Sequence, residues 1–121
     1  MKAVFDSDIL IDYLQGLPQA RLEMELFTQK CVSIVSWMEV LAGAENADQE
    51  KKCRGFLDRF KTIDVNQEIA EQTLLIRRKN KLKLPDAIIW ATAQHQGCLL
   101  ITRNKRDFPK HDPGIRIPYE V

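Results

Sequence analysis

Four acidic residues at the edges of apolar runs are the part of this sequence best suited to do chemistry. They are Asp6, Glu39, Asp86 and Asp107. Asp6 follows the apolar residues 3–5, and Asp107 lies just past the run 98–102. Carboxylates gathered where buried strands end would form an all-oxygen pocket, and such pockets favour hard cations such as Mg²⁺ or Mn²⁺. A cation held there can activate water and assist the hydrolysis of a phosphodiester.

Each of these acids also has an ordinary structural explanation. Ser36 and Glu39 match a helix capping box, and Asp6 can cap a first helix. Asp86 follows Pro85 in a first helical turn, where negative charge is favoured, and Asp107 can be a turn residue. Caps and turns have no reason to gather at one edge of a sheet. We therefore expect the acids to lie together, with a cation offsetting the repulsion between them.

The order of the elements predicts how these acids are brought together. Strands are expected at 2–5, 31–35, 62–65, 98–102 and 115–117. Helices are expected at 8–15, 19–29, 36–43, around 53–60, at 67–79 and at 86–96. This alternation predicts a single α/β domain over residues 1–121, with helices on both faces of a mostly parallel sheet of four to five strands. Ligands bind beyond the carboxyl ends of such strands, which is where Asp6, Glu39 and Asp107 fall and where Asp86 can join them.

The charge of the chain is unevenly distributed. The formal net charge is +1, but residues 1–50 hold three Lys/Arg and nine Asp/Glu, whereas residues 51–121 hold fifteen and eight. Basic runs occur at 51–54, 77–83 and 103–106. Such runs can contact phosphates or can simply be solvated helix faces. Only the last run, with Arg103, Lys105 and Arg106, lies beside one of the four acids.

The composition excludes several classes of protein. Hydrophobic residues make up 45% and charged residues 29% of the 121 residues, and no apolar run approaches the ~20 residues needed to span a bilayer. An acid at position 6 comes too early for a signal peptide. The three cysteines (Cys31, Cys53 and Cys98) lack metal-type spacing, so we expect buried thiols in a reducing cytoplasm. His95 and His111 are expected at the surface.

Four segments resemble the motifs of PIN-domain proteins. Residues 4–12 resemble the opening motif, in which a strand ends in Asp-Thr/Ser-Asn/Asp, and residues 36–43 resemble the second, with its Glu and later Gly. Residues 84–93 resemble the third, and residues 101–108 resemble the fourth, commonly Thr-Arg-Asn-x-x-Asp-Phe. The motifs occur in order and span almost the whole chain. The length is most similar to that of the VapC toxins of bacterial toxin–antitoxin pairs.

The resemblance implies a three-layer α/β/α PIN-like nuclease that cuts RNA and depends on Mg²⁺ or Mn²⁺. Asp6, Glu39 and Asp86 would be the central catalytic metal ligands, with Asp86 orienting the ion and the attacking water. Some relatives carry an Asp at the position of Asn104, so either Asn104 or Asp107 completes the acidic set. The residues that would support the ligands by hydrogen bonds are Ser7, Thr102 and Asn104. Those that would contact RNA phosphates are Arg103, Lys105 and Arg106.

The resemblance also implies protein partners. VapC-like proteins are usually homodimers, and each is bound by an antitoxin that covers the acidic site. Phe27, Trp37, Met38 and Trp90 are candidates for apolar contact surface or, equally, for the core; we expect Trp90 in the core. No membrane association is expected.

Three other classes remain open at this point. In a signalling receiver domain, Asp64 would accept phosphate, with Thr102 and Lys105 assisting. A haloacid-dehalogenase-like phosphatase is suggested by Asp6-Ser7-Asp8, although those enzymes usually need a longer chain. The last alternative is a binding module without activity, which the full acidic set disfavours.

Overall fold

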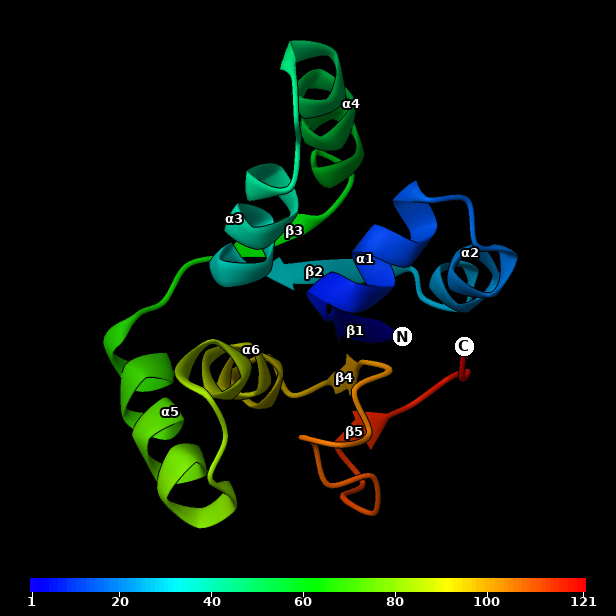
Figure 1. The fold of residues 1–121 in the computed structure, drawn as a ribbon. Helices are drawn as coiled ribbons and strands as arrows, with labels where there is room; N and C mark the ends of the chain where they lie inside the picture. Colours follow the sequence, from blue (N-terminus) through cyan, green and yellow to red (C-terminus); the bar gives the residue numbers. More distant parts are fainter.

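The computed structural model describes all residues 1–121 and is built around one parallel sheet (Figure 1). The strands are β1 (Lys2–Phe5), β2 (Gln29–Ser33), β3 (Lys61–Ile63), β4 (Leu99–Ile101) and β5 (Ile115–Arg116). Their order across the sheet is β3-β2-β1-β4-β5, and every neighbouring pair is parallel. The carboxyl ends of all five strands therefore point to the same edge, and β1 lies in the middle.

Six helices connect and cover the strands. They are α1 (Ser7–Leu14), α2 (Pro18–Glu25), α3 (Ile34–Ala42), α4 (Ala47–Leu57), α5 (Gln67–Asn80) and α6 (Leu84–His95). None of them is long and apolar enough to cross a membrane.

The sheet separates two hydrophobic clusters, one on each face. Successive side chains of a strand point to opposite faces, so Val4 packs in the cluster that contains Trp90, while Ala3 and Phe5 pack in the cluster that contains Phe27. Helices α5 and α6 lie on one side of the sheet, and α1, α2 and α4 lie on the other (Figure 1). This arrangement confirms the predicted three-layer α/β fold with a parallel sheet.

The turn from β2 into α3 differs from the sequence-based prediction. The expected strand 31–35 ends at Ser33, whose hydroxyl accepts a hydrogen bond from the N–H of Val35 at 3.1 Å and caps α3. The helix therefore begins at Ile34, and the prediction that Ser36 begins it is wrong, as is the Ser36 capping box. Ser36 is fully buried inside α3, and its hydroxyl has no hydrogen-bond partner. The capping serine outweighs the β-branched character of Ile34 and Val35.

The expected helix 19–29 is also shorter in the structure. Helix α2 ends at Glu25, because Gln29 already pairs with Lys2 in the sheet. Cys31 is buried, as predicted, whereas Cys53 and Cys98 are partly buried; all three are free thiols. Trp90 and Phe27 lie in the core, Trp37 is half-buried, and Met38 is exposed.

Candidate metal centre

Asp6 lies at the carboxyl end of the central strand and is held by two hydrogen bonds. It caps α1 and is 5% exposed. Its Oδ1 accepts from the N–H of Ser7 at 2.7 Å, and its Oδ2 accepts from the hydroxyl of Thr102 at 2.7 Å. Thr102 follows β4, the neighbour of β1 in the sheet. The sheet thus brings together two residues that are 96 positions apart.

Asp8 is a second carboxylate of this centre, and the sequence reasoning did not select it. Its Oδ2 accepts from the N–H of Arg103 at 3.2 Å and from the hydroxyl of Thr102 at 3.4 Å. Its Oδ1 is buried and has no hydrogen-bond partner. The sequence did contain a signal for Asp8, namely two acids separated by one serine directly after a strand. Asp6 caps α1 and Asp8 lies in its first turn, so both carboxylates lie near the end of β4.

Glu39 and Asp86 reach the same region from α3 and α6. The carboxylate of Glu39 accepts a hydrogen bond from the hydroxyl of Ser7 at 2.5 Å, so the residue after Asp6 contacts α3. Asp86 lies in the first turn of α6 and is half-buried. Burial raises the pKa of Asp86, and the negative charges of Asp107 and Glu39 raise it further.

Asp107 is fixed by a reciprocal pair of hydrogen bonds with Asn104. The Asn104 side-chain amide donates to Asp107 Oδ2 at 3.0 Å, and the N–H of Asp107 donates to Asn104 Oδ1 at 3.2 Å. The N–H of Asn104 in turn donates to the hydroxyl oxygen of Thr102 at 3.1 Å. Asn104 thus links Asp107 to the residue that holds Asp6.

The electrostatics show how closely these acids interact. Burial raises the pKa of Asp6 to about 8, the charges of Asp8 and Asp86 add to the rise, and the hydrogen bonds from Thr102 and Ser7 oppose it. Burial also raises the pKa of Asp8, although the hydrogen bond from the Arg103 N–H lowers it in part. Like charges in a poorly solvated site destabilise one another. The folded protein therefore carries an electrostatic cost here that a bound cation would offset.

The residues fit a hard divalent cation in their chemistry, although no group of three or more His, Cys, Asp or Glu side chains is arranged to hold an ion as the side chains stand. The donors are carboxylates, and the buried Asp8 Oδ1 has an unused lone pair. Glu39 and Asp107 each accept a protein hydrogen bond on one carboxylate oxygen, Oε1 and Oδ2 respectively, whereas Asp6 accepts one on each oxygen. An ion would therefore be bound through the remaining lone pairs after small side-chain movements or through water, which is usual for Mg²⁺.

The three basic residues of the fourth motif have different environments. Arg103 forms two hydrogen bonds with Asp12, Nε to Oδ2 at 2.7 Å and Nη2 to Oδ1 at 3.1 Å. Lys105 is exposed and pairs with Glu120 at 2.7 Å. Arg106 is exposed and takes part in no ion pair.

A hollow of about 600 Å³ opens beside Asp107. It is lined by residues 105–111 and by Asn80 at the end of α5. Lys105, Arg106 and Lys110 make its surface basic. This hollow thus extends from the acidic centre along a cationic surface.

The position of Asp64 disfavours the receiver alternative. Asp64 is exposed and follows β3, an edge strand, whereas Thr102 and Lys105 follow β4. Strands β2 and β1 lie between β3 and β4. The three residues that a receiver would need are therefore separated across the sheet.

The fold and the carboxylates at the sheet edge agree with the result of a comparison with known families. The profile of the PIN domain matches residues 3–112, and the chain belongs to the PIN domain family. This confirms the resemblance seen in the four motifs.

Within that family, the chain is similar to VapC ribonucleases. It is 30% identical to Ribonuclease VapC10 of Mycobacterium tuberculosis, an alignment that covers 96% of this chain and 92% of that protein. It is 27% identical to the tRNA(fMet)-specific endonuclease VapC of Shigella flexneri, over 91% of this chain and 92% of that protein.

Solved structures show the same fold. A chain of a toxin-antitoxin complex from Klebsiella pneumoniae superimposes with a TM-score of 0.92 at 45% identity, covering 98% of this chain and 99% of that chain. A chain of DNA-bound VapBC from Salmonella typhimurium gives a TM-score of 0.79 at 26% identity, covering 97% and 96%.

Neutralising Asp6 should stabilise the protein in the absence of metal. Because folding raises the pKa of Asp6 from 3.8 to about 8, its ionisation favours the unfolded state as the pH rises above 3.8. We expect Asp6→Asn to raise the free energy of unfolding by about 1–3 kcal/mol in EDTA at pH 7.5, with a smaller gain at pH 5. Asparagine also retains the helix cap.

Urea denaturation of both proteins measures this difference. The exposed Asp64 supplies the matched control, since Asp64→Asn should change stability by less than about 0.5 kcal/mol. If Asp6→Asn did not raise the free energy of unfolding above that of Asp64→Asn at pH 7.5, Asp6 would carry no electrostatic cost.

Proposed function

We propose that this protein is an Mg²⁺- or Mn²⁺-dependent endoribonuclease that acts as the toxin of a toxin–antitoxin pair, with residues 1–121 as one nuclease domain. The observation that carries the proposal is the hydrogen-bonded set at one edge of the sheet, in which Ser7 joins Asp6 to Glu39 and Thr102 and Asn104 join Asp6 to Asp107. The names of the similar proteins, VapC ribonucleases from two bacteria, support the same reaction.

The carboxylates would hold the cation and orient the reacting water. Asp6, Glu39 and Asp86 are the proposed ligands, and Asp107 or Asn104 completes the set. A bound divalent ion would lower the pKa of a water molecule and reduce the charge on the scissile phosphate. Asp86 is the least constrained of the ligands, because no protein group donates a hydrogen bond to its side chain, and it is well placed to orient the attacking water.

The neighbouring polar groups would keep the ligands in position. Thr102 fixes Asp6, Ser7 fixes Glu39, and Asn104 fixes Asp107, each by a hydrogen bond of 3.0 Å or less. Groups that hold metal ligands in this way commonly contribute 10–100-fold to metal affinity or activity. They would also keep the carboxylates apart before the ion binds.

RNA would follow the basic hollow into the acidic centre. Lys105 and Arg106 are the proposed phosphate contacts, together with Lys110 from the same hollow. Arg103 would contact phosphate only if its ion pair with Asp12 opened. With a net charge of only +1, the protein gains little from general attraction to RNA, so recognition of shape or of a structured substrate is expected.

The proposed partners are an antitoxin protein and a second copy of this chain, in the cytoplasm. The Klebsiella pneumoniae structure, one chain of which is 45% identical to this chain, is by its description a toxin-antitoxin complex. An antitoxin that covers the acidic centre would block both the cation and the RNA.

Asp86→Asn should abolish RNA cleavage without unfolding the protein. Purified wild-type protein is incubated with tRNA and rRNA fragments in Mg²⁺ or Mn²⁺, and cleavage should cease in EDTA and in the variant. Removing a ligand carboxylate should reduce the rate at least 100-fold. Asp64→Asn is the control and should cut like wild type. Cleavage by Asp86→Asn at the wild-type rate would refute the nuclease proposal.

Expression in a bacterial host tests the toxin role separately. Wild-type protein should arrest growth, Asp86→Asn should not, and coexpression of a small protein encoded next to this gene should restore growth. Harmless expression of protein that is active in vitro would contradict the toxin role while leaving the nuclease activity intact.

Arg106→Ala should weaken RNA binding and reduce its salt dependence. Fluorescence anisotropy in the inactive Asp86→Asn background measures the affinity for labelled RNA at several salt concentrations. The logarithm of the association constant falls linearly with the logarithm of the salt concentration. Loss of one phosphate contact should make this negative slope shallower by about 0.7–1. Lys51→Ala, on α4 and outside the hollow, should leave the slope unchanged. Equal effects of the two substitutions would contradict the proposed path.

A further inference from the structure

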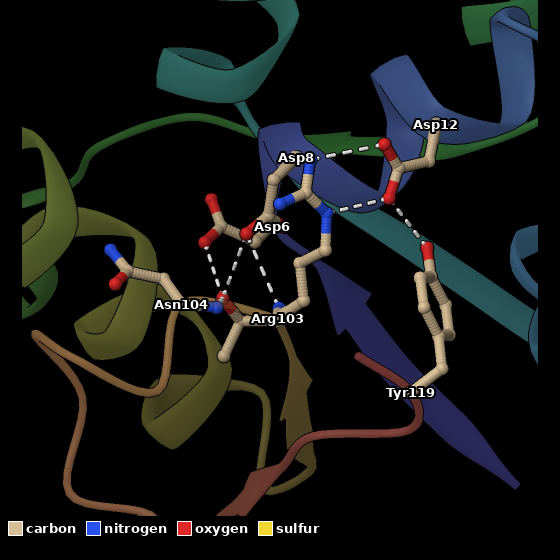
Figure 2. Close-up of polar contacts among 7 residues, drawn as sticks. Asp6, Asp8, Asp12, Arg103, Asn104 and Tyr119 are labelled. Carbon is tan, nitrogen blue, oxygen red and sulfur yellow. Dashed lines mark hydrogen bonds and ion pairs between the residues drawn. The ribbon is translucent and has the colours of Figure 1, made fainter. Parts of the chain in front are cut away.

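One buried carboxylate, Asp12, has no place in the mechanism proposed above. It lies in α1, one turn after Asp8, and is 5% exposed. The Arg103 guanidinium donates to both of its oxygens, and the Tyr119 hydroxyl donates to Oδ2 at 2.9 Å. Figure 2 shows Asp12 between these two side chains, with Asp6 and Asp8 on the other side of Arg103. Three donors thus converge on one carboxylate from segments 91 and 107 positions away.

Arg103 and Tyr119 keep the protonation states that donation to Asp12 needs. Burial and the hydrogen bond to Asp12 raise the pKa of the Tyr119 hydroxyl above its usual value, so it remains a donor. The hydrogen bond to Asp12 raises the pKa of Arg103, which stays charged. An Arg–carboxylate pair with two parallel bonds has a defined orientation, and the added tyrosine fixes the carboxylate from a third direction.

The position of Arg103 determines the geometry of the loop after β4. Its N–H donates to Asp8, the preceding Thr102 donates to Asp6, and the following Asn104 donates to Asp107. Donors to Asp6, Asp8 and Asp107 therefore lie within three consecutive residues, and only the support of Glu39 by Ser7 lies elsewhere. A shift of the Arg103 backbone would move each of these donors relative to the carboxylate that it holds.

Tyr119 is itself brought to Asp12 by a second ion pair. Arg116 in β5 forms two hydrogen bonds with Glu23 of α2, which is 5% exposed. Strand β5 pairs with β4, and the segment that follows it reaches α1 through the hydrogen bond from Tyr119 to Asp12. Lys105 and Glu120 add an exposed contact between this segment and the loop.

We propose that Asp12, Arg103 and Tyr119 form a clamp that positions residues 102–107 for cation binding, and that they are positioning residues that touch neither the ion nor the RNA. The proposal rests on the proposed function for its cation. It assigns Tyr119, outside the four motifs, a role in the acidic centre. It also gives Arg103 a role other than contact with RNA phosphate.

Tyr119→Phe tests the clamp by removing one hydroxyl group. Tyr13→Phe is the matched control, because Tyr13 lies in α1, the helix that carries Asp12, and its hydroxyl accepts a hydrogen bond from Arg59 at 3.2 Å, away from the acids. Two quantities are measured in each protein. The first is amide hydrogen exchange of residues 102–107 in metal-free protein, and the second is the dissociation constant for Mn²⁺ alone, by calorimetry.

We expect Tyr119→Phe to speed exchange of the Arg103 and Asn104 amides roughly tenfold and to weaken Mn²⁺ binding about three- to tenfold, somewhat below the range for direct partners of metal ligands. Tyr13→Phe should change neither quantity. A lower melting temperature with unchanged exchange and unchanged Mn²⁺ affinity would show that Tyr119 only stabilises the fold, and would overturn the proposal.

Arg103→Lys separates positioning from RNA contact. Lysine keeps the positive charge but cannot form both bonds to Asp12, so we expect weaker Mn²⁺ binding and a lower kcat with little change in KM. A higher KM with wild-type kcat and wild-type Mn²⁺ affinity would identify Arg103 as a phosphate contact and refute its place in the clamp.

Failure of the proposed function can be distinguished from failure of the clamp. If wild-type protein bound no Mn²⁺ and cut no RNA, the proposed function would fail. Hydrogen exchange in metal-free Tyr119→Phe would still decide whether the clamp orders the loop.

Discussion

Repulsion between buried carboxylates at the end of β1 is the constraint to which the rest of the structure responds. Asp6 is almost completely buried, and this burial, with smaller contributions from the charges of Asp8 and Asp86, raises its pKa to about 8. A sequence selected only for stability would replace one of these acids, because an uncompensated buried charge is costly. The fold instead surrounds the acids with donors from Ser7, Thr102 and the backbone of Arg103. The metal-free site thus disfavours the ionised form of its acids, and a bound cation would favour that form, so stability is given up here for function.

The parallel sheet makes this concentration of charge possible. Because β1 and β4 are adjacent and parallel, the residues after both strands meet, and α3 and α6 add Glu39 and Asp86 from the two sides. The same topology joins the ends of the chain to the centre, since β5 carries the segment with Tyr119 back to α1. The loop 102–107 joins these parts, because it donates to Asp6 and Asp8, contains Asp107 and lines the basic hollow.

Much of the fold and part of the centre could be predicted from the sequence. The apolar runs followed by acids predicted β1 and β4. Ligands bind beyond the carboxyl ends of parallel strands, and this rule predicted that Asp6 and Asp107 lie at the same edge of the sheet. The boundary at Ser33 was missed, because Ser33 and Ser36 are equally plausible caps and β-branched residues separate them. Asp8 and Asp12 were not selected, since an acid every fourth residue in a helix looks like a solvated face. Their partners Arg103 and Tyr119 are 91 or more positions away, and no local pattern reports such a contact.

The central claim is that carboxylates from separate elements share one divalent cation, and anomalous diffraction from crystals containing Mn²⁺ tests it most directly. The account predicts a manganese peak at the carboxyl end of β1, within ligand distance of Asp6 and Asp86 and within reach, directly or through water, of Glu39 and Asp107. It also predicts that the peak is lost in Asp6→Asn crystals grown in the same way. A peak at any other place, or none at this sheet edge at millimolar Mn²⁺, would contradict the account.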